Sequence, residues 1–363
     1  MKDKILEIAK NIGIDEIGFT NTLNLDYLRP VLEKRISNNF SCEFEENNID
    51  KRLNIKDYFV GCRSIICVAF PYAQGYKIPN KSNMGNLSVS SFGIDYHRIV
   101  KEKLNELAEK IKEIKSFNYT ICVDTTPLVD RAICKNSGLG YIGNNSMLIN
   151  SRYGSFVFLG YILTDLDISQ DENKVNDSCG SCNICRIKCP NHAIQPDGTI
   201  NTKRCVSYLT QTKDYIEIKY RKALGHQIYG CDICQYYCPK NKHILDLDTQ
   251  CNYEELLVEL KELFYISNKE FKIKYGHLAG SWRGKNIWKR NAIIASANMK
   301  LYEMFDIISE ELKYDNDMIK LYASWALLEI DRDKAKDLIF KRIKYENEIV
   351  QNEYRKLLEV KNE

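Results

Sequence analysis

The sequence contains no long apolar run, no stretch with the apolar core typical of a secretory leader and no strong excess of charge of either sign. No stretch approaches the roughly 18 consecutive apolar residues that a membrane helix needs. The first residues carry apolar side chains at helical spacing, where a signal peptide would have a continuous apolar core. The net charge of +3 does not by itself indicate a polyanionic partner. We therefore expect a cytoplasmic protein with no membrane partner, and any case for nucleic acid must come from local charge.

The 363 residues are too many for one ordinary core, and the sequence pattern changes twice along the chain. Residues 1–165 alternate helical and strand-like patterns, with strands expected at 65–70, 119–123 and 155–163. We expect an α/β domain here, a cysteine-rich domain at 166–250 and a helical domain at 251–363. A helix expected at 95–115 would bury Ile99, Leu104, Leu107, Ile111 and Ile114.

The C-terminal third repeats one helical pattern. Residues 288–299 and 319–330 both place small and large apolar side chains on one face. Stacked hairpins of this kind are typical of HEAT-like repeats, but a plain helical bundle explains the same pattern, and both interpretations stay open. The expected fold class is α+β multidomain, with an N-terminal α/β domain, a ferredoxin-like two-cluster domain and C-terminal HEAT-like helices.

Fourteen cysteines are many for such a chain, and eight of them lie between residues 179 and 238. The segment from Cys179 to Pro190 has the C-x2-C-x2-C-x3-C-P spacing of bacterial ferredoxins, in which three thiolates hold one [4Fe–4S] cluster and the fourth holds another. A second half ends at Pro239, but Ile228 stands where its first cysteine is expected, and Cys205 is the obvious substitute.

We therefore assign one [4Fe–4S] cluster to Cys179, Cys182, Cys185 and Cys238, and the other to Cys189, Cys205, Cys231 and Cys234. Two zinc sites with four cysteine ligands each are the alternative. Zinc sites present separated C-x2-C pairs, and they do not need the crowded third thiolate or the two Cys-Pro endings. The other cysteines are expected to be small core side chains: Cys42, Cys62, Cys67, Cys122, Cys134 and Cys251.

Two clusters in series imply single-electron transfer to an acceptor in the N-terminal domain. The sequence from Gly138 to Gly143 matches a dinucleotide-binding fingerprint, but it follows a helical stretch at 128–136, so we interpret it as a helix end and turn. Asp124 follows the strand at 119–123, where α/β folds place catalytic groups. It could equally be the N-cap of a helix that begins near Pro127, and both roles stay open.

Several motifs, in order, resemble the epoxyqueuosine reductase family over nearly the whole chain. They are EENNIDKR ending at Arg52, FGIDYH at 92–97, VDTTPLVDRA at 123–132, SGLGYIG, the two cysteine motifs, RCVSYLTQTK at 204–213, and SNKEF, GSWRGK and KRNAI within 267–293. The resemblance implies an enzyme that reduces epoxyqueuosine at the wobble position of tRNA to queuosine, an alkene. It also implies cobalamin as the acceptor that the two clusters feed.

The resemblance further implies roles for particular residues. Cobalamin would bind the N-terminal domain, with contacts from Arg52 and from the backbone of Asp232 and Ile233, and with no side chain ligating cobalt from below. Asp124 would contact the cofactor and supply the proton, and partial desolvation by the corrin would raise the pKa of its carboxyl. The chain departs from the family at Asn144, where many members carry lysine. It also has Asp130-Arg131 where Glu-Arg is frequent in the family.

A basic stretch that contains Trp282 and Trp288 could hold RNA through cations and stacking rings. A solvated helix face would explain the same charges. With the resemblance, the expected tRNA contacts are Lys213, Arg283 and Lys285, with Asn268 and Lys269 at a helix start whose N–H groups could take a phosphate. The cations of the stretch are Lys269, Lys272, Lys274, Arg283, Lys285, Lys289 and Arg290.

Two other functions fit parts of the sequence. A cobalamin-dependent reductive dehalogenase shares the clusters and the corrin, but those enzymes usually carry an export signal and need no basic helical tail. A ferredoxin-type electron carrier on a helical scaffold would leave residues 1–165 without a purpose. For the reductase we expect a monomer that receives electrons from flavodoxin or ferredoxin, and the sequence does not choose between these donors.

Overall fold

The computed structural model describes residues 1–171 and 178–359, which form two compact units. The first unit draws on 1–77, 94–205 and 232–251, and the second on 78–93, 206–231 and the described chain from 252 onward. These units are interleaved along the sequence, whereas the three domains expected from the sequence are contiguous. The boundaries at 1–165, 166–250 and 251–363 stay a prediction.

The first unit is built around a four-stranded sheet of order β1-β2-β7-β4. Every neighbouring pair is antiparallel. The strands are β1 (Glu16–Thr20), β2 (Ser64–Pro71), β7 (Val157–Thr164) and β4 (Tyr119–Cys122). The three strands expected from the sequence are thus confirmed to within about two residues.

The position of β7 makes this sheet antiparallel although the sequence alternates strands and helices. β2 and β4 both run antiparallel to β7 and are therefore parallel to each other, and α5 (Tyr96–Lys112) lies between them in the chain, as in a β-α-β unit. β7 comes later and inserts between them. The expected α/β domain is therefore α+β in its strand pairing, because local alternation carries no information about a strand that inserts later.

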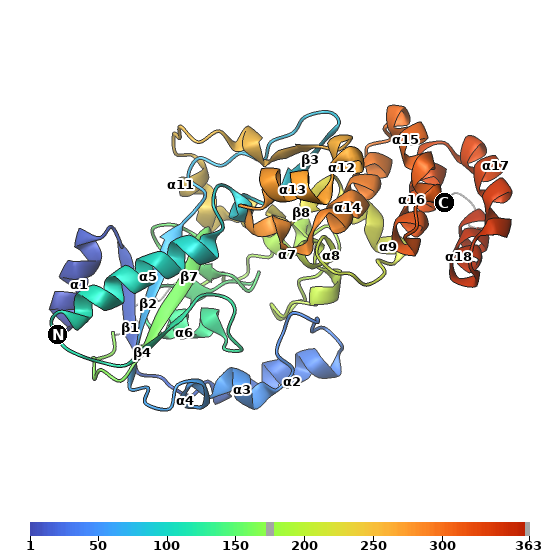
Figure 1. Cartoon of the computed structure of the whole chain (residues 1–363). Helices are drawn as coiled ribbons and strands as arrows, with labels where there is room; N and C mark the ends of the chain where they lie inside the picture. Colours follow the sequence, from blue (N-terminus) through green and yellow to red (C-terminus); the bar gives the residue numbers. More distant parts are fainter. Residues whose placement is uncertain (172–177, 360–363) are drawn as a thin grey trace. The chain divides into compact units, whose positions relative to one another are not determined.

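Helices cover both faces of this sheet (Figure 1). Alternate residues of β2 point to opposite sides, so that Ile66 and Val68 pack with α1 (Lys2–Asn11) and α5, while Ile65 and Cys67 pack with α6 (Asp130–Asn136). The helices and the hairpin strands of this unit, besides α5, are α1 (Lys2–Asn11), α2 (Arg29–Ser37), α3 (Ile49–Leu53), α4 (Ile55–Tyr58), α6 (Asp130–Asn136), β5 (Tyr141–Ile142), β6 (Leu148–Ile149), α7 (Ile184–Lys188), α10 (Ile233–Tyr236) and α11 (Lys242–Leu245).

Helix α5 begins after Asp95, whose carboxylate accepts the backbone N–H of His97 at 3.1 Å. Leu104, Leu107 and Ile111 are buried as expected. The prediction that Ile99 and Ile114 are buried was wrong, since they are 44% and 43% exposed. Val100 and Ala108 are buried on this helix as well. At the end of α6, Gly138 has φ +81°, which confirms that the glycine motif is a helix end.

The second unit combines a small sheet with a helical stack. Its three strands have the order β8-β3-β9, with β3 parallel to β8 and antiparallel to β9. The helices expected at 288–299 and 319–330 correspond to α14 and α16, which pack on each other. The elements are β3 (Met84–Leu87), α8 (Val206–Leu209), α9 (Ile218–Arg221), β8 (Gln227–Tyr229), β9 (Leu257–Glu259), α12 (Glu262–Tyr265), α13 (Asn268–Tyr275), α14 (Lys285–Asn298), α15 (Phe305–Glu310), α16 (Asp317–Ile330), α17 (Arg332–Arg342) and α18 (Glu348–Glu359). The HEAT-like interpretation stays a prediction.

Within the described residues, no helix has both the length and the apolar character that crossing a membrane requires. All fourteen cysteines are free thiols in this structure. Of the six outside the cluster motifs, Cys42, Cys62, Cys67, Cys122 and Cys134 are buried as expected. Cys251 is exposed, so its assignment to the core was wrong.

Candidate active site and cluster ligands

Asp124 lies two residues after the end of β4, and its carboxylate is fixed by the first turn of α5. The Tyr96 hydroxyl donates to Asp124 Oδ2 at 2.7 Å, and His97 Nε2 lies 3.4 Å from the same oxygen. The Asp124 side chain is nevertheless 63% exposed, so one side of the carboxylate is accessible. Helix α6 begins only at Asp130 and has Val129 at its N-cap, which excludes the N-cap role for Asp124.

The backbone at Asp124 adopts the left-handed region, with φ +54°. Such a conformation is unfavourable for a residue with a side chain and persists where surrounding contacts hold it. The hydrogen bond from Tyr96 and the contact with His97 are such contacts. His97 is oriented in turn by Asp95, whose Oδ1 lies 2.7 Å from His97 Nδ1.

The surroundings of Asp124 and Asp130 shift the pKa values of these two carboxyls in opposite directions. The hydrogen bond with His97 is the largest influence on Asp124 and lowers its pKa, with Tyr96 and the charge of Arg131 acting in the same direction. The raised pKa expected for Asp124 is therefore not found in the protein alone. Conversely, the hydrogen bond to Asp124 raises the pKa of His97, and Asp95 adds to this effect.

Asp130 is the second carboxyl, and sequence reasoning noted it only as a departure from the family. Burial raises its pKa to about 6, and the negative charge of Asp124 adds to the shift. The Tyr161 hydroxyl donates to Asp130 Oδ1 at 2.7 Å. Carboxyls whose environments move their pKa values apart are a common sign of acid–base chemistry. The motifs FGIDYH and VDTTPLVDRA contain this group of residues, so a signal for it was present in the sequence.

Arg52 belongs to a cationic group around Glu45. Arg52 Nη1 lies 3.2 Å from Glu45 Oε2, and Arg35 makes two bonds of 2.7 Å to the same carboxylate. Among the described residues, the buried Arg52 Nε has no hydrogen-bond partner. A buried donor without a partner is costly and indicates a ligand or a water at that position. Arg131 carries a third guanidinium, close enough to Arg35 for the two charges to interact.

Asp232 is buried and is the N-cap residue of α10. Its Oδ2 accepts a hydrogen bond of 2.9 Å from the hydroxyl of Tyr76, which is also buried. Ile233 is the first residue of the same helix and is partly buried. The peptide between Asp232 and Ile233, expected to contact a cofactor, is thus held in place by a buried side chain.

The cysteines of the first unit form two groups. Cys185 and Cys238 both lie close to Cys179 and Cys182: burial raises the pKa of each thiol, and the neighbouring thiolates add to the shift. Cys189, Cys205 and Cys234 instead share an apolar cluster with Ala193 and Ile194, to which Cys185 also belongs. Because Cys185 occurs in both groups, this proximity does not divide the eight thiols between two clusters, and the assignment from spacing stays a prediction. Cys231 belongs to the second unit.

The expected tRNA contacts all lie in the second unit. Lys213, Asn268 and Lys269 are exposed. Arg283 lies over the ring of the exposed Trp282, 4.3 Å from its centroid, and its Nε donates to Gln211 O at 2.8 Å. Lys285 is partly buried, and burial lowers its pKa.

Three other members of the basic stretch cannot contact RNA, because they are buried inside the unit. Trp288 is 1% exposed and packs against Phe271 and Tyr275. Lys289 pairs with Glu311 at 2.9 Å, and Arg290 donates to backbone carbonyls, including that of Leu209 at 2.7 Å. A count of charges along the sequence does not show that α14 is buried on nearly all sides.

The helix start at Asn268 is confirmed, but its N–H groups are partly used. Ser267 Oγ accepts the N–H of Glu270 at 3.2 Å, and the Glu270 carboxylate accepts the N–H of Ser267 at 2.8 Å. This capping box satisfies two donors and places a negative charge at the helix start. A phosphate would have to compete with Glu270 at this position.

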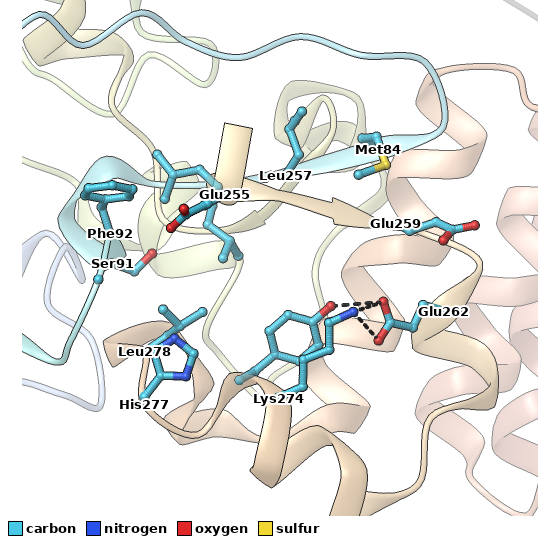
Figure 2. A pocket seen from close by; sticks show the side chains of 14 residues that line it. Met84, Ser91, Phe92, Glu255, Leu257, Glu259, Glu262, Lys274, His277 and Leu278 are labelled. Carbon is cyan, nitrogen blue, oxygen red and sulfur yellow. Dashed lines mark hydrogen bonds and ion pairs between the residues drawn. The ribbon is translucent and has the colours of Figure 1, made fainter. Parts of the chain in front are cut away.

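The second unit also contains a pocket of about 440 Å³ next to α13 (Figure 2). Glu255, Glu259 and Glu262 line it, and Glu262 is bound by Lys274 at 2.5 Å and by the Tyr275 hydroxyl at 3.2 Å. The surplus of carboxylates makes this pocket unsuitable for phosphate, so it does not form part of the expected RNA contacts.

Two family models match the chain. One, described as "Epoxyqueuosine reductase QueG, DUF1730", covers residues 52–125, which contain Arg52, Tyr96, His97 and Asp124. The other, described as "4Fe-4S double cluster binding domain", covers residues 178–241 and all eight cysteines of the two motifs. The cluster interpretation is therefore supported over the zinc alternative.

Named relatives agree with both models. The chain is 38% identical to the epoxyqueuosine reductase of Staphylococcus aureus, over 100% of this chain and 97% of the relative. A crystal structure of epoxyqueuosine reductase with an epoxyqueuosine-modified tRNA-Tyr stem loop matches with a TM-score of 0.91 and 34% identity, over 99% of this chain and 98% of that one. A Bacillus subtilis structure in which an aspartate catalytic loop is swung out of the active site matches with the same TM-score, identity and coverage.

Proposed function

Because the chain belongs to the epoxyqueuosine reductase family, we propose that it reduces epoxyqueuosine at the wobble position of tRNA to queuosine, with cobalamin and two [4Fe–4S] clusters. One observation carries this proposal: the first unit contains both the anchored Asp124 and seven of the eight motif cysteines. Family membership favours the reductase over the dehalogenase and the electron carrier considered above.

The residues present suit the two clusters. Cys179, Cys182, Cys185 and Cys238 would hold one, and Cys189, Cys205, Cys231 and Cys234 the other; the free thiols, the motif spacing and the match to a double-cluster binding domain over residues 178–241 support this set. When bound, [4Fe–4S] clusters pass one electron at a time. A flavodoxin or a ferredoxin would supply those electrons, and we propose that the enzyme acts as a monomer.

The residues around Arg52 suit a large cofactor with polar side groups. The unpartnered Arg52 Nε offers a donor, and Arg35 and Arg131 give the region a positive charge around Glu45. The peptide of Asp232 and Ile233 follows directly after a cluster ligand and would contact the cofactor beside it. When bound, cobalamin supplies a strongly reducing centre for cleavage of a carbon–oxygen bond.

The protein's own contribution to the reaction is the handling of protons. Conversion of an epoxide to an alkene and water consumes two electrons and two protons, and a proton must reach the oxygen as the carbon–oxygen bond breaks. Asp124 is accessible on one side and hydrogen-bonded on the other, so it can carry a proton to a bound substrate. In the protein alone the contact lowers the pKa of Asp124 and raises that of His97, which favours the proton on His97. That proton would pass through the Asp124 carboxylate to the substrate as negative charge develops on the departing oxygen.

The tRNA would be held by the second unit. Arg283 and Lys213 supply cations, and Trp282 supplies an exposed ring whose Nε1 is fixed by Gln211 Oε1 at 3.1 Å. Lys285, Asn268 and Lys269 complete the proposed contact surface. The stem-loop complex of the relative supports RNA as the partner.

The direct test is incubation of the holoenzyme with epoxyqueuosine-containing tRNA, cobalamin and a low-potential reductant, followed by mass analysis of the nucleosides. We expect the modified nucleoside to lose one oxygen atom in an enzyme-dependent manner. An unchanged nucleoside, with both clusters intact and cobalamin bound, would contradict the proposed function.

A further inference from the structure

The turn between β5 and β6 connects the residues around Asp124 with both cysteine loops. Arg131 Nη1 donates to the carbonyl of Ser146, within the turn. At the tip, the backbone N–H of Asn144 donates to Cys179 Sγ at 3.3 Å, and Asn144 Nδ2 donates to Cys182 O at 2.7 Å. Asn145 Nδ2 lies 3.5 Å from Cys234 O. All these residues belong to the first unit.

We propose that Asn144 is a positioning residue that sets the reduction potential of the cluster held by Cys179, Cys182, Cys185 and Cys238. This inference rests on the proposed function only in that these cysteines hold a [4Fe–4S] cluster. An N–H group directed at a cysteine sulfur stabilises the more negative, reduced state of a cluster and so raises its potential.

The side chain of Asn144 is the part that makes this hydrogen bond specific. The Asn144 side-chain amide donates to the carbonyl of Cys182. This hydrogen bond holds the backbone N–H of the same residue against Cys179 Sγ. The turn is closed independently by the Gly143 N–H, which donates to Met147 O at 2.9 Å, so the turn itself does not depend on the Asn144 side chain. A change at Asn144 should therefore act on the sulfur and leave the turn in place.

The length and neutrality of asparagine determine the sign of the effect. The amide reaches the Cys182 carbonyl without adding charge, whereas a lysine ammonium could donate to the same carbonyl and would also bring a cation to this ligand loop. A positive charge stabilises the reduced cluster by Coulomb attraction. The cluster held by Cys179, Cys182, Cys185 and Cys238 should therefore have a lower reduction potential in this chain than in a variant with lysine at residue 144.

The test is a redox titration of anaerobically purified holoprotein, followed by EPR so that the two clusters are resolved. Asn144→Ala should shift the midpoint of one cluster to a more negative value, Asn144→Lys should shift it to a more positive value, and the other cluster should stay unchanged in both. Asn105→Ala is the matched control, since the Asn105 amide also donates to a backbone carbonyl, that of Lys101 at 2.9 Å, on an exposed helix face. It should move neither midpoint.

Midpoints that stay at the wild-type value in both Asn144 variants, or that shift equally for both clusters, would overturn the inference. Loss of iron from both variants would also overturn it, because Asn144 would then be needed to retain the cluster and not to tune it. Absence of [4Fe–4S] clusters from the wild type is a different result, and it would contradict the proposed function itself.

Discussion

At the scale of single residues, the group formed by Asp95, Tyr96, His97 and Asp124 explains how one carboxylate can be both fixed and accessible. Tyr96 and His97 contact Oδ2 of Asp124, while most of the side chain remains exposed. The hydrogen bonds hold a backbone conformation that would otherwise be unfavourable. The same contacts lower the pKa of Asp124 and raise that of His97, which favours an ionised Asp124 beside a protonated His97.

Asp124→Asn should lower turnover by about 100-fold or more, because the amide cannot deliver a proton, while a similar shape is kept. The measurement is single-turnover nucleoside analysis, with iron content and cobalamin binding measured on the same sample. Asp167→Asn is the control, since Asp167 forms an exposed ion pair with Arg63 at 2.7 Å. Turnover retained at the wild-type rate in Asp124→Asn would exclude the proton-donor role.

His97 should titrate above the ordinary histidine range, and Asp124→Asn should lower its pKa, because the hydrogen bond to Asp124 is the main cause of the shift. Since the folded-state pKa is the higher one, His97 contributes stability that is fully present below the unfolded pKa. That contribution is lost as the pH rises through the folded pKa. NMR titration of the His97 ring in the two proteins measures both values. Equal pKa values in the two proteins would show that Asp124 does not hold the His97 proton.

At the scale of elements, α14 shows why charge along a sequence is a poor guide to a binding surface. The sequence of this helix contains Lys285, Lys289 and Arg290 beside Trp288. Trp288, Lys289 and Arg290 are nevertheless buried. Lys289 and Arg290 are satisfied by Glu311 and by backbone carbonyls. The exposed aromatic ring is Trp282, in the turn before α14.

The two tryptophans should therefore respond differently to substitution. Trp288→Ala should destabilise the second unit by about 3–5 kcal/mol, because it removes a large buried ring. Trp282→Ala should leave stability nearly unchanged and weaken tRNA binding. Thermal unfolding and tRNA titration of both variants provide the comparison. A Trp282→Ala protein that unfolds at a clearly lower temperature than the wild type, but binds tRNA with the wild-type affinity, would contradict the assignment of these roles.

Sequence spacing was informative where chemistry demands a local pattern and weak where contacts are long-range. The cysteine motifs identified the candidate ligands, and the strand before Asp124 located the carboxylate. The partners of Asp124 were not identified, because Tyr96 lies 28 residues away on another element. The antiparallel pairing of the sheet was missed for the same reason, since β7 follows both strands that it joins.

At the scale of the whole molecule, the proposed function assigns most of the redox residues to the first unit and the tRNA contacts to the second. The first unit contains the Asp124 group, the Arg52 group and seven motif cysteines, and the second contains every proposed tRNA contact. Substitutions at these proposed tRNA contacts should therefore affect the affinity for tRNA without affecting the clusters, whereas a substitution of Cys231, which also lies in the second unit, should affect a cluster.

Arg283→Glu and Lys285→Glu together should weaken tRNA binding strongly at low salt and reduce the slope of log affinity against log salt by about one for each lost cation. Affinity measured over a series of salt concentrations tests this. Lys110→Glu, an exposed position in the first unit, is the control. A salt slope unchanged from that of the wild type would exclude Arg283 and Lys285 as phosphate contacts.

The metal content of the anaerobically purified chain tests the central claim most directly, because every electron in the proposed reaction passes through the motif cysteines. Two [4Fe–4S] clusters predict about eight iron atoms and about eight sulfide ions per chain, with the absorption and EPR signals of cubane clusters. Zinc bound in place of iron and inorganic sulfide would contradict the claim.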